Sequence, residues 1–244
     1  MGSLMTILTF NIRYGLAEDG EHSWPLRRHA TAQVIREIDA DIVCFQEDLD
    51  FQLQYLLGQL PDYAAYSVGR DDGDKEGEAC TILWRKSRFA PLDKGTFWLS
   101  DTPNEPGSKN WGNNITRICS WVDFGTFALF NTHWDHESQP ARANSANLIH
   151  RHLPLTPWIL VGDLNAEPDS SEVLALPGIL HTAGLEGGTF HNFEGGTEGE
   201  KIDHLVSSID FRCTKLEVIQ TQFDGLWPSD HYPVVAELLM NSGQ

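Results

Sequence analysis

The sequence predicts an α/β fold in which two β-sheets pack face to face and helices cover their outer sides. Three observations lead to this prediction. Helix and strand patterns alternate in the first and middle thirds of the chain, and strand patterns cluster elsewhere. Hydrophobic residues make up 41% and charged residues 21%, which excludes a disordered or fibrous chain. No apolar run approaches the roughly 18 residues of a membrane-spanning helix.

The first part of the chain alternates between strand and helix patterns. An apolar strand is expected at residues 4–11. A helix follows that begins near Trp24 and Pro25, because proline suits the first turn and apolar residues then recur at helical spacing. The short apolar run 41–46 is typical of a buried strand, and residues 48–60 again follow a helical pattern.

The rest of the chain consists mostly of predicted strands. They are expected at 64–68, 79–85, 89–99, 116–122, 127–133, 158–163, 202–207, 211–219 and 232–239. Ser138 is expected to cap a helix that runs through about His152, and a short helix is expected at 170–176. Three long polar loops are expected at 69–78, 100–114 and 186–200. Loops of this length are typically functional or mobile.

The chain is expected to form a single domain over residues 1–244. Its 244 residues can bury a large core without a disulfide or a metal, and they contain no repeat, low-complexity tract or linker. The four cysteines lie far apart in apolar segments without a CxxC pair, which predicts reduced core thiols. The first six residues show no secretory signal pattern, so we expect a soluble, cytoplasmic protein.

Charge is the strongest global signal. The 17 Lys and Arg residues against 35 Asp and Glu residues give a net charge of −18. Such a field disfavours broad non-specific binding to DNA or to an anionic membrane. It does not exclude a phosphate substrate at a local metal site, because a bound divalent cation can dominate the field of its own pocket.

The sharpest local motif is WILVGDLN at residues 158–165. An apolar strand runs into Gly162, and Asp163 and Asn165 follow two positions apart, which places both side chains on one face if the chain is extended. The carboxylate can orient a water molecule, and the carboxamide beside it can donate a hydrogen bond to a phosphoryl oxygen. An ordinary β-turn is an equally good interpretation of these residues alone.

A second polar unit, PSDHYP at residues 228–233, precedes the last apolar strand. It places Asp230 and His231 side by side in a proline-flanked loop. A histidine polarised by a carboxylate is a useful phosphate contact. Taken alone, this unit is better interpreted as a solvated turn.

Four further polar groups lie where a predicted strand begins or ends. His133 and Asp135 follow one strand and share a face by parity. Glu47 follows the buried run 41–46, where a charge is costly unless it leaves the core or meets a cation. Asn11 ends the first strand, and Asp203 begins a late one. Surface or capping roles are the better interpretation for each of these groups alone.

Together, the six units resemble the endonuclease/exonuclease/phosphatase superfamily of metal-dependent phosphoesterases. The resemblance runs from Leu8 to Pro233 through LTFNIR, CFQE, NTHWDH, GDLNAEP, KIDH and PSDHYP, in that order. GDLN and SDH are its specific elements. It implies a four-layered α/β sandwich in which two packed, mainly antiparallel sheets are flanked by helices. It also implies Mg²⁺- or Mn²⁺-assisted hydrolysis of a phosphoester, either as a phosphodiesterase or as a phosphatase.

The resemblance also implies roles for the metal-side residues. Glu47 is similar to the metal-binding glutamate, and Asp230 to a carboxylate that can assist a second metal position. Asn11 is similar to the asparagine of the metal and phosphate network. Asp163 resembles the aspartate that orients or deprotonates the attacking water. A hard oxygen ligand such as Glu47 suits Mg²⁺.

On the phosphate side, the resemblance implies that Asn165 and His133 contact the phosphoryl group. His231 is similar to the histidine that stabilises the phosphate, with Asp203 as its orienting carboxylate. His204 departs from the aromatic residue that often follows this aspartate. Additional phosphate-side or supporting groups are Arg70, Arg117, Asp135 and His136.

Two alternatives belong to other functional classes. The segment His133-x-Asp135-His136 is similar to half of a zinc-hydrolase motif, but Asn131 replaces the first histidine that such sites need. The second alternative is a catalytically inactive binding module on the same fold. Five carboxylates are expected to face one cleft, and they would repel each other without a cation, which favours a metal site over an empty groove. These five are Glu47, Asp135, Asp163, Asp203 and Asp230.

The substrate partner is predicted less directly. The net charge and the acidic loop 69–78 favour a small phosphoester, such as a phosphorylated sugar, nucleotide or lipid headgroup, over duplex DNA. Trp111, Phe190 and Phe193 offer apolar faces for a sugar or base ring. A nuclease acting on DNA or RNA is the alternative, because Arg13, Arg70, Lys109 and Arg117 could form a local basic patch.

Overall fold

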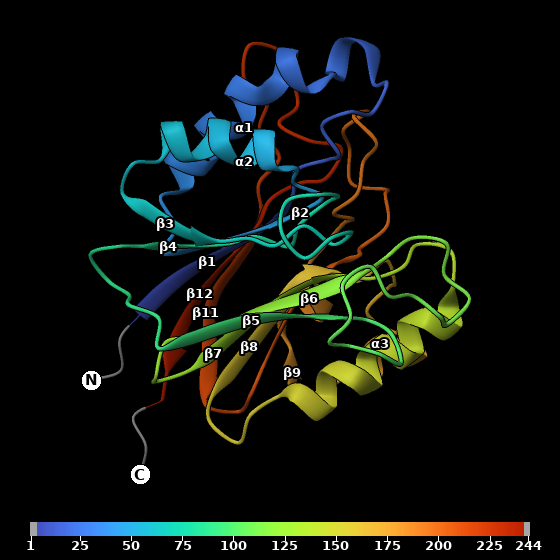
Figure 1. Cartoon of the computed structure of the whole chain (residues 1–244). Helices are drawn as coiled ribbons and strands as arrows, with labels where there is room; N and C mark the ends of the chain where they lie inside the picture. The colour runs from blue at the N-terminus through green and yellow to red at the C-terminus, as the bar shows by residue number, and fades with distance from the viewer. Residues whose placement is uncertain (1–3, 242–244) are drawn as a thin grey trace.

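The computed structural model describes residues 4–241, and two packed six-stranded sheets form its centre (Figure 1). Helices lie against the outer side of each sheet. The prediction of two mainly antiparallel sheets flanked by helices is therefore confirmed. No helix within residues 4–241 is both long enough and apolar enough to cross a lipid bilayer.

The first sheet is covered on its outer face by α1 (Trp24–Ile38) and α2 (Asp50–Gln59) (Figure 1). Its strands in spatial order are β11 (Phe211–Val218), β12 (Val234–Met240), β1 (Leu4–Asn11), β2 (Ile42–Gln46), β4 (Ile82–Arg85) and β3 (Tyr63–Tyr66). β1 and β2 are parallel, and the other pairs are antiparallel. Leu8 and Phe10 belong to the core cluster under the helices, whereas Ile7 belongs to the cluster between the sheets, as the two-residue period of a strand requires.

The second sheet carries α3 (Gln139–His152) and the short α4 (Ser171–Leu174) on its outer side. Its strands in spatial order are β5 (Asp93–Trp98), β6 (Ile118–Asp123), β7 (Ala128–His133), β8 (Trp158–Asp163), β10 (Asp203–Ser207) and β9 (Ile179–Leu180). Only β7 and β8 are parallel among the strand pairs described for this sheet. Two 3₁₀ turns, η1 (Gly20–His22) and η2 (His181–Gly184), lie outside the sheets.

Most predicted elements are present, and their ends differ for local reasons. Ser138 caps α3 as expected, since its hydroxyl accepts a hydrogen bond from the backbone N–H of Ala141. β5 begins at Asp93 rather than at residue 89, because Phe89 closes a turn onto Arg85 and Pro91 lacks a ladder donor. β4 begins three residues later than expected, and the two-residue β9 was not predicted.

The topology brings the polar strand ends to one place. The parallel pairs β1–β2 and β7–β8 end at the same edges of their sheets, at Asn11 beside Gln46 and at His133 beside Asp163. β10 and β12 run in the opposite direction, so their first residues lie at these edges, and Asp203 is paired with Asp163. Both sheets therefore direct functional groups to one end of the sandwich.

Gly162 is needed for the close approach of β7 and β8. Its φ is +149°, and a Cβ placed there would lie 1.9 Å from the carbonyl oxygen of Thr132. We expect Gly162→Ala to lower the free energy of unfolding by about 3 kcal/mol or more, because overpacking of a rigid core typically costs 1–3 kcal/mol and here the obstacle is backbone. Urea denaturation measures this change.

Gly58 provides the matched control for this substitution. It lies in α2, and a Cβ there would meet nothing within 4 Å. Gly58→Ala should stabilise the protein by about 0.5–1 kcal/mol through helix propensity. Equal stability effects of the two substitutions would contradict the steric argument.

Candidate active site

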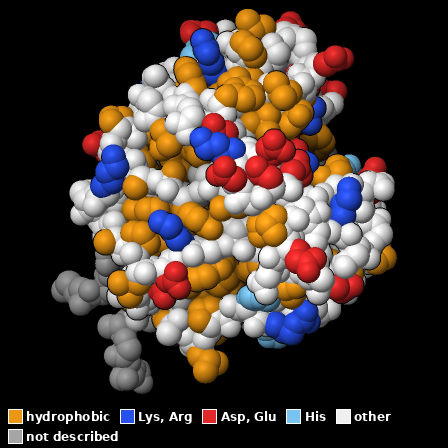
Figure 2. Space-filling view, viewed as in Figure 1, with side chains coloured by type: hydrophobic (Ala, Val, Ile, Leu, Met, Phe, Trp, Pro, Cys, Tyr) orange, Lys and Arg blue, Asp and Glu red, His pale blue; other side chains and the backbone are white. Residues whose placement is uncertain are grey.

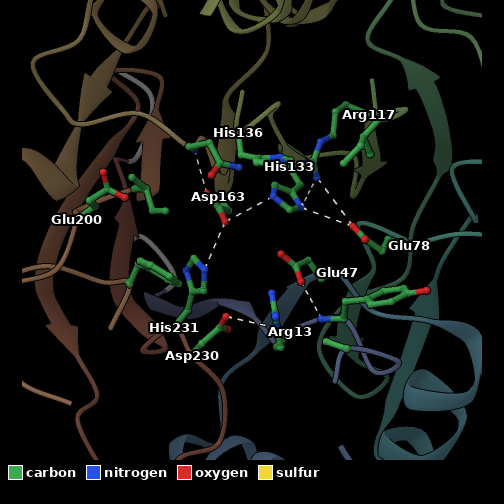
Figure 3. A pocket seen from close by; sticks show the side chains of 16 residues that line it. Arg13, Glu47, Glu78, Arg117, His133, His136, Asp163, Glu200, Asp230 and His231 are labelled. Carbon is green, nitrogen blue, oxygen red and sulfur yellow. Dashed lines mark hydrogen bonds and ion pairs between the residues drawn. The ribbon is translucent and has the colours of Figure 1, made fainter. Parts of the chain in front are cut away.

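A pocket of about 370 Å³ opens at the end of the sandwich where the polar strand ends meet (Figure 3). It is lined by Arg13, Tyr14, Ala17, Glu47, Glu78, Ile115, Arg117, His133, His136, Asp163, Asn165, Phe190, Glu200, Ile202, Asp230 and His231. Most of the labelled polar side chains in Figure 3 point toward its centre from both sheets. This volume is in the range of small-molecule sites.

Three lining residues adopt left-handed backbone conformations just after a strand ends. The φ angles are +62° at Arg13, +63° at Glu47 and +47° at Asn165. Such conformations are uncommon for residues other than glycine, and they cost of order 1–3 kcal/mol each. Their grouping around one pocket is typical of a functional site, where the backbone turns so that side chains face a ligand.

Asp163, at the end of β8, is at the centre of the polar network. Its Oδ1 accepts a hydrogen bond from the backbone N–H of Asn165 at 2.9 Å, and its Oδ2 accepts one from Asn11 Nδ2 at 2.9 Å. The same Oδ2 lies 3.6 Å from His133 Nε2 and 3.7 Å from His231 Nε2. The carboxylate is therefore fixed on its inner side and flanked by two imidazoles.

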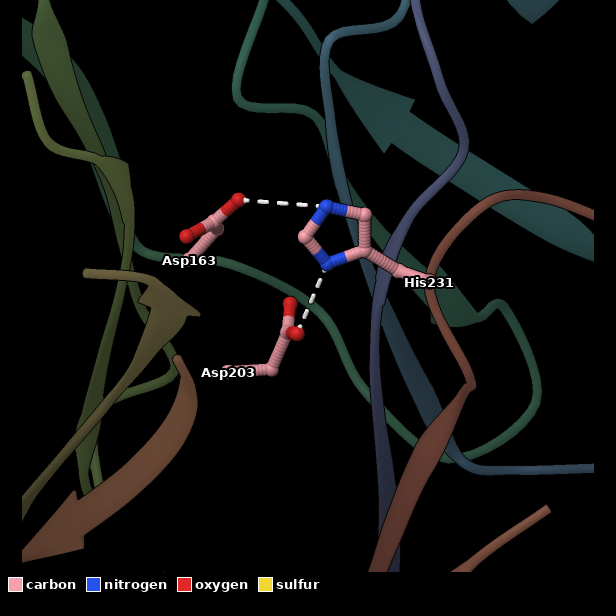
Figure 4. Close-up of side chains that lie close together, drawn as sticks. All are labelled: Asp163, Asp203 and His231. Atoms are coloured by element: carbon pink, nitrogen blue, oxygen red, sulfur yellow. Dashed lines mark hydrogen bonds and ion pairs between the residues drawn. The ribbon is translucent and has the colours of Figure 1, made fainter. Parts of the chain in front are cut away.

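His231 is held by Asp203, whose Oδ2 lies 2.8 Å from His231 Nδ1 (Figure 4). Burial alone would lower the pKa of His231, but Asp203, Asp163 and Asp230 raise it to about 10. The imidazole is therefore a cation at neutral pH, with Nε2 directed toward Asp163. Asp163, Asp203 and His231 have potential ligand atoms within 4.8 Å of one another, and Nδ1 of His231 is already engaged by Asp203 Oδ2.

The pKa of Asp163 is raised to about 7. Burial is the main cause and the neighbouring Asp203 adds to it, while His231 and the hydrogen bonds from Asn11 and Asn165 act in the opposite direction. A carboxylate with a pKa near neutrality suits a general base. Because Asp163 and His231 interact strongly, their titration belongs to the pair.

Glu47 and Asp230 are suited to holding a divalent cation. Burial raises the pKa of Glu47, but a hydrogen bond from Asn11, the charge of His231, the N–H of Tyr14 and Arg13 together bring it below its usual value. Burial raises the pKa of Asp230, and repulsion by Glu47 adds to this effect. Two hard carboxylates that repel each other across one pocket match the one or two carboxylates that Mg²⁺ takes from a protein.

Asn11 connects Glu47 to Asp163 through hydrogen bonds. Its Nδ2 donates to Glu47 Oε1 at 3.0 Å as well as to Asp163, and its Oδ1 accepts from the backbone N–H of Arg13. Its carboxamide therefore fixes the positions of the Glu47 and Asp163 carboxylates relative to each other. The direct metal contact implied for Asn11 stays a prediction.

Most residues proposed from the sequence lie together here. Glu47, His133, Asp163, Asn165, Asp230 and His231 line the pocket, and the buried Asn11 and Asp203 lie directly behind it. Asn165 and Asp163 both line the pocket although the chain turns between them, and their chemical roles stay predictions. One amide hydrogen of Asn165 bonds to the carbonyl of Trp134, and the second is left for a ligand.

One expectation about a neighbouring residue is wrong, and the role of a second residue becomes clear. Asp135 does not face the pocket, because its Oδ1 accepts from the backbone N–H groups of Glu137 and Ser138 before α3. His204 is a structural residue, since its Nδ1 pairs with Thr182 and its Nε2 donates to the carbonyl of Ala166.

The pocket also contains residues that sequence reasoning missed or misplaced. Glu78 and Glu200 both line it, although no role was predicted for either carboxylate. Of the predicted aromatic faces, Phe190 lines the pocket, whereas Phe193 stacks on His22 and Trp111 packs toward the core beside α3. The sequence signal for Glu78 is its position before the apolar strand β4. The strands β4, β10 and β12 all begin near the pocket end of the sandwich, so a polar residue before any of them can reach the pocket.

Comparison with known proteins identifies the family and the fold of the chain. The sequence model of the Endonuclease/Exonuclease/phosphatase family matches residues 8–231. An endonuclease/exonuclease/phosphatase family protein from Bacteroides thetaiotaomicron has a similar structure, with a TM-score of 0.92 and 32% identity over 99% of this chain and 100% of that chain. A mannosyl-6-phosphatase from the same species has a TM-score of 0.89 and 33% identity over 96% of this chain and 99% of that one.

A curated relative is more distant. The CCR4-Not complex 3'-5'-exoribonuclease subunit Ccr4 of Phaeosphaeria nodorum is 26% identical over 145 residues, which cover 51% of this chain. The match covers 24% of that protein's length. The family match over most of the chain and the shared architecture lead to one conclusion: the chain belongs to the endonuclease/exonuclease/phosphatase family of phosphoester hydrolases.

Proposed function

We propose that the protein is a Mg²⁺- or Mn²⁺-dependent hydrolase of a small phosphoester. The observation that carries the proposal is the position of Asp163, which lies between a histidinium and a second histidine in the same pocket as Glu47 and Asp230. Phosphoester hydrolysis needs a positioned water, donors for the phosphoryl oxygens and stabilisation of the leaving oxygen.

The residues of the chain divide these tasks. Asp163 accepts a proton from the attacking water, and Asn11 and Asn165 hold its carboxylate in place. His231, charged by its contact with Asp203, and His133 donate to the phosphoryl oxygens from opposite sides. Glu47 and Asp230 would hold the divalent cation, which when bound neutralises charge on the phosphoryl group and on the leaving oxygen.

The surface charge and the pocket support a small substrate. Exposed acidic side chains occupy the 69–78 loop, and Figure 2 shows acidic side chains gathered on this face of the molecule. Arg13 and Arg117 are the only arginines in the pocket lining, which contains no lysine. Long polyanions bind through many Lys and Arg contacts, so this surface suits them poorly. The similarity to a mannosyl-6-phosphatase favours a phosphorylated sugar within the class of small esters.

A substrate panel tests the proposal. With Mg²⁺ or Mn²⁺ present, we expect kcat/KM to be highest on small phosphomonoesters, including sugar phosphates. A plasmid and a single-stranded oligonucleotide should be poor substrates at both low and high salt, because the net charge of −18 opposes their approach. Preference for the nucleic acids, falling steeply as salt rises, would contradict the small-substrate assignment.

A nuclease is the second candidate. The similarity to the exoribonuclease subunit Ccr4 favours it, and the Asp163 chemistry serves a phosphodiester equally well. The same panel separates the two functions, since a phosphodiesterase cleaves the oligonucleotide and bis-esters while a phosphomonoesterase leaves them intact. Binding without turnover of every ester would instead favour the inactive module.

A further inference from the structure

The two histidines that flank Asp163 have opposite partners at Nδ1. His231 Nδ1 faces the carboxylate of Asp203, whereas His133 Nδ1 lies 2.8 Å from Arg117 Nη1. Nη2 of the same guanidinium lies 3.1 Å from His136 Nδ1. Arg117 directly precedes β6, is only 5% exposed and lines the pocket. One arginine therefore contacts two pocket histidines.

The chemistry of the guanidinium determines where the protons lie on these rings. An arginine side chain has only donors, so a ring nitrogen hydrogen-bonded to it has to be an acceptor. Burial lowers the pKa of Arg117, but Glu78, 3.9 Å from Nη1, acts in the opposite direction, and an arginine keeps its charge in proteins. Nδ1 of His133 and Nδ1 of His136 thus carry no proton.

We propose that Arg117 is a positioning residue that holds His133 and His136 as neutral imidazoles with their protons on Nε2. Nε2 of His133 points toward Asp163, 3.6 Å away, at the centre of the pocket (Figure 3). The wall formed by β6 and β7 therefore offers neutral N–H donors, and the opposite wall offers the charged donor of His231. The tautomers follow from the contacts alone, but the donation of these groups to a phosphoryl oxygen rests on the proposed function.

The other charged groups around His133 are consistent with a neutral ring. Arg70 and Glu78 come from the loop before β4, His136 follows β7, His231 precedes β12, and Asp163 ends β8. Burial, followed by Arg117 and Arg70, brings the pKa of His133 well below its usual value. A second imidazolium beside Asp163 would also repel a cation held by Glu47 and Asp230.

Histidine ¹⁵N NMR of the full-length protein tests the proposal without any activity assay. In the wild type, His133 should show a pyridine-type shift at Nδ1 and a pyrrole-type shift at Nε2 from mildly acidic to mildly alkaline pH, and the neutral form of His136 should show the same tautomer. The spectra of His133→Gln and His136→Gln assign the signals. A proton on Nδ1 of His133, or a charged His133 ring at neutral pH, would overturn the proposal. This measurement uses the wild-type protein, so it does not depend on whether an Arg117 variant folds.

Three variants separate positioning from general effects of charge. Arg117→Met should release Nδ1 of His133 to share a proton with Glu78, 3.9 Å away, and raise the titration midpoint of the ring toward its ordinary value. Arg117→Gln keeps an N–H donor and should preserve the wild-type tautomer. Arg70→Gln is the matched control, because Arg70 pairs with Glu78 without contacting His133, and it should also leave the tautomer unchanged. An unchanged tautomer and midpoint in Arg117→Met would contradict the role of Arg117.

Inorganic phosphate with Mg²⁺ distinguishes this proposal from the proposed function. If both are correct, phosphate shifts the Nε2 signal of His133 in the wild type and shifts it less in Arg117→Met. A fixed Nε2–H tautomer that does not respond to phosphate would support the positioning by Arg117 and count against the phosphoryl-binding role of the pocket.

Discussion

Asp163→Asn is expected to lower kcat by about 10²- to 10⁴-fold, the usual contribution of a general base. The asparagine keeps the size of the side chain but cannot accept a proton from water. Substrate should still bind, because His231, His133 and Asn165 remain. Single-turnover kinetics with the best substrate of the panel measures the effect on the chemical step.

The pH profile provides a second measurement for the same residue. The pKa of Asp163 is raised to about 7, mainly by burial, and a general base acts only when it is ionised. The kcat/KM of the wild type should therefore rise with pH through the neutral region. A bound divalent cation moves this limb to lower pH by favouring the carboxylate. Asp163→Asn should remove the limb from its residual activity.

Asp135→Asn is the matched control for this substitution. Asp135 is also a buried aspartate just after a strand, but it hydrogen-bonds the backbone before α3 and lies outside the pocket. Its replacement should lower stability by about 1 kcal/mol, as for a weakened cap, and leave kcat close to that of the wild type. A wild-type kcat in Asp163→Asn, or an equal loss in Asp135→Asn, would place the base elsewhere.

The sequence was informative about the site wherever a polar residue directly ends a buried strand. Asn11, Glu47 and Asp163 could be recognised because a charged or amide side chain there either leaves the core or finds a partner. The parallel pairs then align the strand ends in space, which no single motif reveals. The family resemblance supplied this arrangement, and the observed sheet order agrees with it.

The alternation of side chains between the two faces of a strand gave poorer predictions for residues beyond the end of the strand. His133 is the last residue of β7, so the chain is no longer extended at Asp135, which turns to the backbone before α3. Asn165 also lies beyond its strand, in a left-handed conformation, and yet it reaches the pocket. Alternation of faces holds only while ladder hydrogen bonds keep the backbone extended.

The contacts of Arg117 and Glu78 could not be predicted from the sequence, for another reason. The sequence indicated Arg117 only as a phosphate-side or supporting group, and the place of Glu78 before an apolar strand does not show which distant residues it pairs with. Their burial depends on each other and on Arg70 and His133, which come from distant segments. A buried charged network is a tertiary property, because no single member is stable in the core without the others.

Chelation of divalent cations should abolish activity, and Mg²⁺ or Mn²⁺ should restore it. Glu47→Gln removes one negative charge from the proposed ligand pair while keeping the shape of the side chain. It should raise the Mg²⁺ concentration needed for half-maximal activity by about 10²-fold or more, since even loss of a residue that only supports a ligand costs 10–100-fold. Glu200→Gln, at the exposed rim of the same pocket, controls for the loss of negative charge and should leave the Mg²⁺ requirement unchanged.

Thermal unfolding tests the same site independently of turnover. A cation that binds only the folded protein stabilises it by about 2.7 kcal/mol at a concentration one hundred times its Kd. Mg²⁺ should therefore raise the Tm of the wild type and of Glu200→Gln, and have little effect on Glu47→Gln. Without the cation, Glu47→Gln relieves the repulsion between Glu47 and Asp230, so its Tm should be close to that of the wild type. Full turnover in excess chelator, or an equal Mg²⁺ shift in Glu47→Gln and the wild type, would rule out Glu47 as the metal ligand.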